Sequence, residues 1–103
     1  MAEFIFAYYG GRPPKTPEEG QAFMTRWRVW ASEMSDAFVH PGSVFGKSWT
    51  VSESGAAEGA VHPLSGYSIV KAESFEAALD LARRCPHVEH GTIEVAEVKP
   101  MPS

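Results

Sequence analysis

Cysteine is almost absent from this chain of 103 residues, which contains only Cys85. A lone cysteine cannot form an internal disulfide, so no disulfide framework stabilises the fold. No apolar run approaches the roughly 20 residues that a transmembrane helix needs. The short apolar segment at residues 4–9 lacks the basic leader of a secretion signal. We therefore expect a cytoplasmic protein with no membrane partner.

Positive charge is also scarce. Lys and Arg total 9 against 13 Asp and Glu, and the net charge is -4. This balance lacks the basic surface that nucleic acids require, so we expect no nucleic-acid partner. Hydrophobic residues make up 44% and charged residues 21% of the chain, which is ordinary for a globular protein. With this length, the composition predicts a single domain over residues 1–103.

The first strand is predicted from an aromatic and β-branched run at residues 4–9, which ends at two glycines. Both of its faces are apolar: Phe4, Phe6 and Tyr8 lie on one, and Ile5, Ala7 and Tyr9 on the other. A strand with two apolar faces needs to be covered on both sides.

Two helices are expected. Thr16, Pro17 and Glu19 have the pattern of a capped helix start. Apolar residues then recur at helical spacing, and they are Phe23, Trp27, Trp30, Met34 and Ala37. We expect this helix to end before the His-Pro-Gly at 40–42. Ser74 is predicted to cap a second helix, which Pro86 ends.

Three further strands are predicted at residues 44–53, 64–72 and 92–98, with a flexible turn at 54–59. The resulting β-α-β-β-α-β order predicts an α+β, ferredoxin-like fold, a four-stranded antiparallel sheet with two helices on one face. The first and third strands would be central. Their second apolar face would remain bare in a monomer, and the simplest cover is a second copy related by a two-fold axis. We therefore predict a homodimer.

The second half of the chain carries a series of motifs. A Gly-Tyr strand start at 66–67, a Glu-Ala-Ala helix at 76–78, a Cys-Pro stop at 85–86 and Gly-Thr-Ile-Glu-Val at 91–95 follow in order. In this order and spacing the chain resembles the YCII-related family, also called the DGPF family. The front half matches more loosely, through residues 8–11 and Trp27-x-x-Trp30. The resemblance implies a dimeric α/β barrel and no established general activity.

Some members of that family carry a His on the first helix and an Asp before the Pro that ends the second, proposed as a catalytic pair. By this resemblance, Trp27 and Cys85 stand at those two positions. Neither can replace the proton transfer of a His–Asp pair. The tetrapeptide that names the DGPF branch is also missing, because residues 59–63 read Gly-Ala-Val-His-Pro. The resemblance alone therefore does not predict an enzyme.

The candidate residues for a ligand pocket combine aromatic rings with a thiol and an imidazole. They are Trp27, Tyr8, Trp49, Cys85 and His87. The alternative for Trp27 is a core position, because aromatic residues at helical spacing are typically core; Trp30 is assigned to the core. Cys85 falls at the end of a helix, where the dipole disfavours a thiolate. A buried core cysteine is the preferred interpretation over a nucleophile helped by His87.

The segment Cys85-Pro-His-Val-Glu-His90 contains groups that could bind zinc. No second cluster is placed to complete a tetrahedral site, so we expect no metal and no cofactor. Three functional hypotheses remain. The first is a small dimeric domain that binds a small organic ligand or has an accessory or regulatory role. The second is an enzyme that uses His87, His90 or His62 for proton transfer. The third is a protein-interaction module, since some relatives are joined to transcription sigma factors.

Overall fold

The structure is a computed structural model that describes residues 1–100. Its elements follow in the order β1 (Ala2–Gly10), α1 (Pro17–Glu33), β2 (Phe38–Val44), β3 (Trp49–Ser52), β4 (Gly55–Glu58), β5 (Leu64–Ala72), α2 (Phe75–Arg83), the 3-10 helix η1 (Pro86–Glu89) and β6 (Gly91–Glu97). None of the helices within residues 1–100 is both long and apolar enough to span a membrane.

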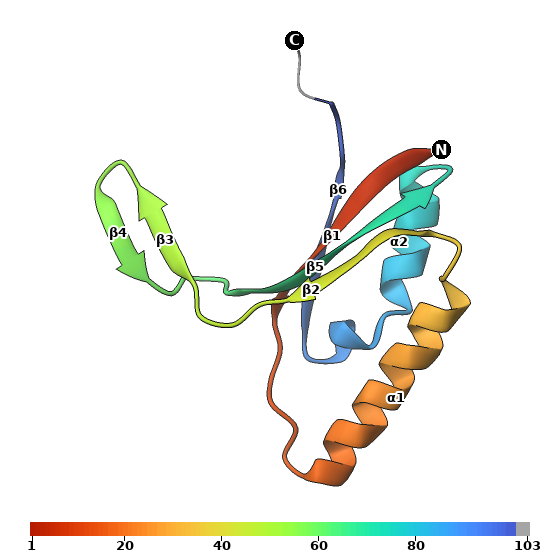
Figure 1. Ribbon diagram of the computed structural model, residues 1–103, viewed down its shortest axis with the longest axis horizontal. Helices are drawn as coiled ribbons and strands as arrows, with labels where there is room; N and C mark the ends of the chain where they lie inside the picture. The colour runs from red at the N-terminus through yellow and green to blue at the C-terminus, as the bar shows by residue number, and fades with distance from the viewer. Residues whose placement is uncertain (101–103) are drawn as a thin grey trace.

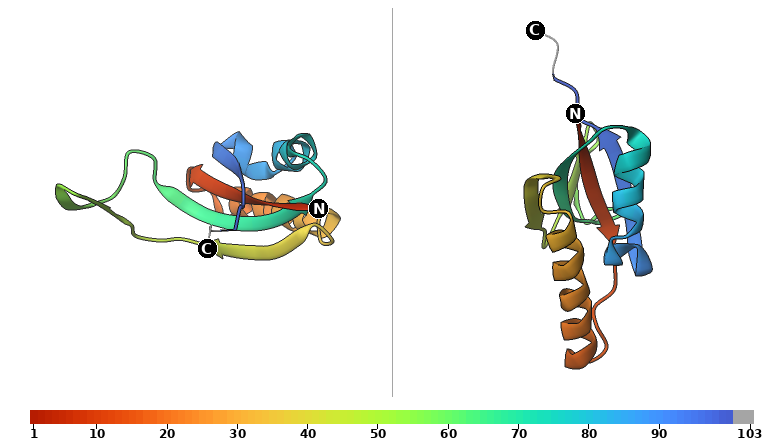
Figure 2. Two further views of the ribbon diagram at one scale, coloured as in Figure 1. Left: turned by 90° about the horizontal axis from the view of Figure 1, so that it is seen from above. Right: turned by 90° about the vertical axis from the view of Figure 1, so that its right-hand side faces the viewer.

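Four of the strands form one antiparallel sheet in the order β2-β5-β1-β6. Figure 1 shows both helices on the same side of this sheet, and Figure 2 shows the opposite face without cover. The predicted ferredoxin-like α+β fold is confirmed, with β1 and β5 at the centre. The molecule is thin, with extents of 42 × 41 × 18 Å.

The hydrophobic core lies between the sheet and the helices. Alternate residues of the central strands point inward and are buried: Phe4, Phe6 and Tyr8 from β1, and Ser68, Val70 and Ala72 from β5. The helices add Trp30, Met34, Ala78 and Ala82. Strand alternation predicts the opposite side chains of β1 and β5 on the uncovered face, which is where the structure places them.

The helix starts match the sequence pattern. The Thr16 side chain accepts a hydrogen bond from the backbone N–H of Glu19 at 3.1 Å, and that of Ser74 accepts one from Ala77 at 3.1 Å. Each cap satisfies a backbone donor that has no partner within the helix. The indole of Trp30 joins the two helices, because its Nε1–H donates to the carbonyl of Leu81 at 3.0 Å.

The prediction that the second strand runs over residues 44–53 is wrong. Helix α1 ends at Glu33, and the second strand of the main sheet is β2. The Pro41-Gly42 pair is tolerated because β2 is an edge strand, where proline costs no ladder hydrogen bond. The register between β2 and β5 is irregular on both sides of His40, which accommodates the proline and glycine.

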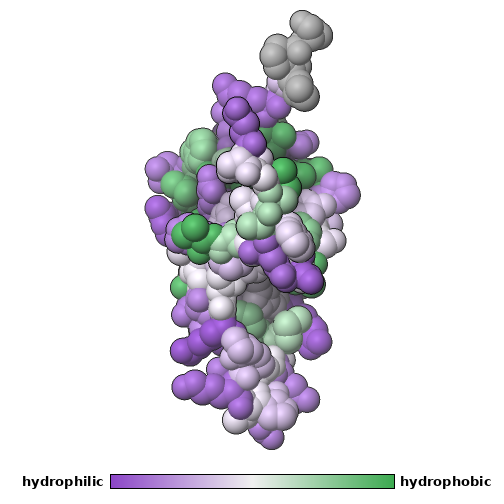
Figure 3. Space-filling model, turned by 90° about the vertical axis from the view of Figure 1, so that its left-hand side faces the viewer, coloured by the Kyte–Doolittle hydropathy of each residue, from purple (hydrophilic) through white to green (hydrophobic). Residues whose placement is uncertain are grey.

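Residues 49–58, predicted as the end of a strand and a flexible turn, form a separate hairpin of β3 and β4. We call this hairpin the arm. It projects away from both helices, at the left in Figure 1 and in the left view of Figure 2. Seen from the side on which the arm projects, hydrophobic side chains gather on the upper half of the molecule, whereas its lower end is mostly hydrophilic (Figure 3).

Replacing Trp30 tests the contact between the two helices. Trp30 is buried and supplies both core volume and the hydrogen bond to Leu81. We expect Trp30→Ala to lower the free energy of unfolding by about 3–5 kcal/mol in urea denaturation. The neighbouring Val29→Ala, at a side chain 53% exposed, should change it by less than about 0.5 kcal/mol. Equal effects of the two substitutions would contradict this account.

Candidate functional site

Three aromatic side chains from three different elements meet where the core ends. The ring of Tyr8, from β1, lies 5.4 Å from that of Trp27, on α1, and 5.4 Å from that of His87, on η1. Both contacts are edge-to-face, the arrangement that aromatic pairs prefer. The segment η1 is held against α1 by an ion pair between Arg26 and Glu89, which lowers the pKa of the Glu89 carboxyl. This docking places His87 beside Tyr8.

The hydroxyl of Tyr8 is committed to a chain of hydrogen bonds. Ser68 Oγ donates its proton to the carbonyl of Pro41 at 2.7 Å, so Tyr8 must donate to Ser68 Oγ at 2.9 Å. Tyr8 pairs across the ladder with Gly66, which leaves space for the ring to reach Ser68 diagonally. Burial raises the pKa of Tyr8, so the phenol stays protonated. Only the lone pairs of its oxygen remain free for a ligand.

The imidazole of His87 is similarly fixed. Its Nε2 lies 2.9 Å from the carbonyl oxygen of Tyr9. Because a carbonyl only accepts hydrogen bonds, Nε2 must carry a proton, which in the neutral ring leaves Nδ1 as a lone pair. Space for this contact exists because residue 91 is glycine, and a Cβ there would collide with both the Tyr9 oxygen and His87 Nε2.

These side chains line a cavity of about 210 Å³, which we call the aromatic pocket. Its lining residues are Tyr8, Trp27, Pro41, Gly42, Ser43, Val44, Ser65, Gly66, Tyr67, Ser68 and His87. None is an acid, a lysine or an arginine. An apolar protein cavity of about 150 Å³ is enough to hold benzene, so this pocket has room for a molecule with a single ring.

Comparison with protein families agrees with the resemblance seen in the sequence. The model of the YCII-related domain matches residues 35–102, about two thirds of the chain. This chain belongs to the YCII-related family. A search of curated protein sequences finds no significant match.

A solved structure shares the fold of this YCII-related domain. It is the 5-chloro-2-hydroxyhydroquinone dehydrochlorinase of Burkholderia phenoliruptrix, in complex with 2,5-dihydroxybenzoquinone. The similarity covers 93% of each chain, with a TM-score of 0.57 and 12% sequence identity. At that identity the likeness shows the fold alone.

The five pocket candidates occupy three different environments. Tyr8, Trp27 and His87 meet in the aromatic pocket. Cys85 is buried in the core and does not line the pocket. Trp49 lies on the arm, 59% exposed, and does not line the pocket.

Eight of the pocket residues were not identified from the sequence, and two of them, Ser68 and Pro41, form the hydrogen bonds that hold Tyr8. Ser68 lies on the inner, otherwise apolar face of a predicted strand. A buried polar side chain at such a position is expected to have a hydrogen-bond partner. The acceptor could not be anticipated. The Pro41 carbonyl reaches Ser68 because β2 is irregular between His40 and Ser43.

The other histidines that were candidates for proton transfer lie outside the aromatic pocket. His62 lines a shallow depression with Tyr9 and Glu94. His90 packs against Phe23 with ring centroids 5.1 Å apart, and its Nδ1 is buried without a hydrogen-bond partner among residues 1–100. Within the same residues, no group of three or more metal-binding side chains is suitably placed for an ion.

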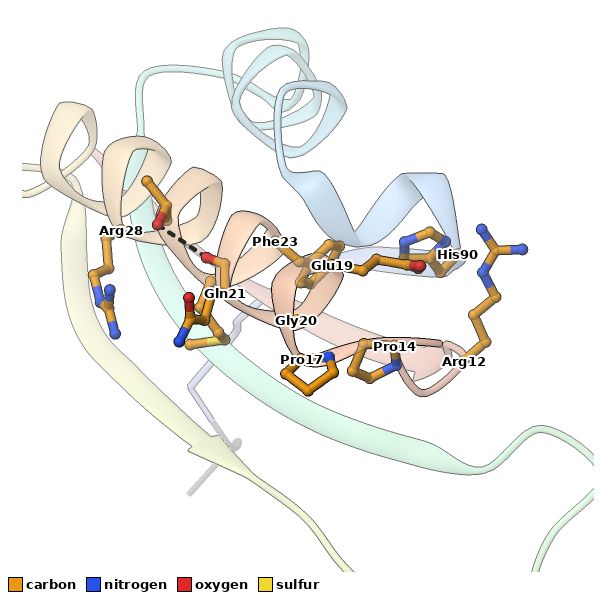
Figure 4. A pocket seen from close by; sticks show the side chains of 11 residues that line it. Arg12, Pro14, Pro17, Glu19, Gly20, Gln21, Phe23, Arg28 and His90 are labelled. Atoms are coloured by element: carbon orange, nitrogen blue, oxygen red, sulfur yellow. Dashed lines mark hydrogen bonds between the residues drawn. The ribbon is translucent and has the colours of Figure 1, made fainter.

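The largest cavity, of about 670 Å³, is an open groove along the first half of α1 that includes His90. Figure 4 shows that its polar side chains do not converge on one point. Arg28 lies at one end of the groove and Arg12 at the other, and Glu19 points toward His90. We therefore place the candidate site in the smaller aromatic pocket, where the polar groups meet.

Gly91→Ala tests how His87 is held. The added methyl group displaces the imidazole from the Tyr9 carbonyl, and we expect a loss of about 1–3 kcal/mol in unfolding free energy. A shift of the His87 side-chain resonances in NMR spectra should accompany it. Gly46→Ala is the control, because a Cβ there meets nothing within 4 Å. Unchanged His87 resonances in Gly91→Ala would show that this contact does not position the ring.

The reactivity of Cys85 follows from its burial, which raises the pKa of the thiol to about 12. The thiolate is then scarce at pH 8, and we expect a disulfide reagent to label native protein at least about 100-fold more slowly than protein unfolded in guanidinium. The folded state holds the thiol proton more tightly than the unfolded state, in which the thiol pKa is about 9. The contribution of the thiol to stability is therefore present below pH 9 and is lost as the pH rises toward about 12. Rapid labelling of the native protein would contradict this assignment.

Proposed function

We propose that this YCII-related domain binds a small, uncharged, planar organic molecule in the aromatic pocket. The observation that carries the proposal is the convergence of Tyr8, Trp27 and His87 on a cavity of about 210 Å³. Rings on neighbouring walls offer faces and edges to a flat ligand. Such a site combines apolar walls with a few polar groups at fixed positions, as small-molecule pockets generally do.

The free polar groups of the pocket define what the ligand must supply. The protons of Tyr8 and of His87 Nε2 are already donated within the protein, so the phenolic oxygen and His87 Nδ1 can only accept. A hydroxyl or amino substituent would satisfy them. A carboxylate would lose its hydration without meeting a cation, because the lining contains none. These features favour a neutral hydroxylated ring over an aromatic acid.

The related fold supports a ligand of this size. The dehydrochlorinase with the same fold is in complex with 2,5-dihydroxybenzoquinone, a hydroxylated compound with one ring. The two chains share 12% identity, so the comparison supports a class of molecule and not a particular substrate.

Titrating the protein with 1,4-dihydroxybenzene tests the proposal, with 4-hydroxybenzoate as the charged counterpart. We expect the neutral compound to quench tryptophan fluorescence through Trp27 and to bind more tightly than the acid. Tyr8→Phe should weaken binding about 3–10-fold, because the ligand loses its hydrogen bond to the phenolic oxygen and one such bond usually contributes this much to affinity. The adjacent Tyr9→Phe is the control, because Tyr9 does not line the pocket. Tighter binding of the acid, or no binding of either compound, would refute the proposed ligand class.

A catalytic role is the second candidate, and His87 favours it. The His87 ring lies 5.4 Å from that of Tyr8 and lines the pocket, and its Nδ1 lone pair would be the group that accepts a proton from a bound hydroxyl. In that case His87→Gln abolishes a pH-dependent turnover but leaves binding within about tenfold. Binding without turnover would leave a ligand-responsive accessory or regulatory domain. Absence of binding would favour the protein-interaction alternative.

We also propose that the domain is a homodimer that pairs its uncovered sheet face. Ile5 and Ile69 are cross-strand partners on that face, as are Ala7 and Tyr67. Leaving these side chains in water would expose an apolar patch at the centre of the sheet. We expect sedimentation to give twice 11.3 kDa at micromolar concentration and Ile69→Asp to give a monomer. A mass of 11.3 kDa for the unmodified chain at every concentration would refute the dimer.

A further inference from the structure

The arm has one largely apolar face that nothing within residues 1–100 covers. Trp49 lies opposite Glu58, and Val51 lies opposite Ala56. Because strand side chains alternate, these four share one face of the arm and Thr50 lies on the other. Trp49 is 59% exposed and Val51 76%. A large aromatic and a β-branched residue side by side in solvent mark a surface that is suited to contact a partner.

The base of the arm is held in place by specific bonds. The backbone N–H of Gly59 donates to the carbonyl of Ser48 at 2.8 Å, and the Thr50 hydroxyl donates to the carbonyl of Gly59 at 2.6 Å. An ion pair of 3.3 Å joins Lys47 to Glu58. These bonds join the two ends of the arm to each other. A two-stranded hairpin is nevertheless only marginally stable in water, so an additional packing surface would stabilise it.

The arm lies on the side of the sheet away from the helices, as Figure 1 shows. Phe45, just before the arm, stacks on Tyr67 with ring centroids 5.8 Å apart and an interplanar angle of 19°. The next residue, Ser68, points into the core, so Tyr67 points to the uncovered face. Phe45 thus links the apolar centre of that face to the base of the arm.

The sheet face offers only part of the contact area that a dimer would use. The four strands are seven to nine residues long, and at the usual spacing they project a flat area of roughly 500 Å². Charged and polar residues interrupt this face, among them Lys71 and Glu94. A standard stable interface buries about 800 Å² of accessible surface on each partner. The arm, at the edge of the sheet, would add apolar contact area for a second copy seated on the sheet.

We propose that the apolar face of the arm, formed by Trp49, Val51 and Ala56, packs against the second copy of the dimer. This inference rests on the proposed homodimer and adds a contact outside the sheet face. In a two-fold assembly each copy both extends an arm and receives one, so the contact is made twice. Trp49 is the anchor, since buried tryptophans at interfaces contribute disproportionately to binding energy.

An arm-deleted variant tests the proposal directly. Ser48 and Gly59 are already hydrogen-bonded neighbours, so residues 49–58 can be replaced by Asn-Gly, the preferred two-residue hairpin turn. We expect the variant to keep the circular dichroism signal of its helices. Under dilute conditions, where it is monomeric, it should still unfold cooperatively. Its dimer dissociation constant, from sedimentation across a dilution series, should rise at least about tenfold.

A point variant and a matched control complete the test. Trp49→Ala should also raise the dissociation constant at least about tenfold, whereas Val29→Ser, on the helical layer, should leave it unchanged. If the unmodified chain is a dimer and both arm variants dimerise equally well, the arm proposal is overturned while the sheet-face dimer stands. If the unmodified chain is a monomer at every concentration, the homodimer fails and the arm proposal fails with it.

Discussion

The buried hydroxyl of Tyr8 is the constraint on which the site depends. Tyr8 is the last inward residue of β1 before the cavity, and leaving its hydroxyl unpaired there would cost about 1–3 kcal/mol. The Ser68 hydroxyl oxygen accepts the proton of Tyr8. The hydroxyl proton of Ser68 is in turn donated to the carbonyl of Pro41. Proline at this position requires an edge strand with an irregular ladder. Gly42, with a φ of 87°, follows it at a point where a Cβ would collide with the backbone of β5.

The same constraint determines the chemistry that the pocket can offer. The protons of the Tyr8 hydroxyl and of His87 Nε2 are already given to the protein, by Tyr8 to Ser68 and by His87 to the backbone of Tyr9. Cys85 lies behind them with a raised pKa, which keeps it neutral. The site therefore has hydrogen-bond acceptors and aromatic surface but no fixed charge. For the proposed ligand, selectivity would come from its shape and from its hydroxyl or amino groups.

Local patterns predicted those parts of the fold that depend on one segment at a time. The alternation of β1 and β5 and the caps at Thr16 and Ser74 depend on neighbouring residues only. The errors arose where the structure of a segment depends on its pairing with a distant segment of the chain. The alternation of Trp49 and Val51 with polar residues is the same whether their strand belongs to the main sheet or to a separate hairpin. Pro41 predicts the end of a strand unless that strand lies at the edge of the sheet. Likewise, the sequence identified three rings of the pocket but not the hydrogen bonds that orient them.

The two central strands supply both faces of the sheet through alternate residues, and this relates the pocket to the proposed dimer. Tyr8 points toward the aromatic pocket, and the adjacent Tyr9 points toward the uncovered face. The same holds for Ser68 and Tyr67 on β5. Any change in strand register would exchange the two sets of side chains, so the pocket and the proposed interface depend on the same ladder. A second copy on the uncovered face would stabilise that ladder and with it the position of Tyr8. The arm begins where β2 ends, beside the pocket wall, so a partner that holds the arm would also restrain the edge strand that provides the Pro41 carbonyl.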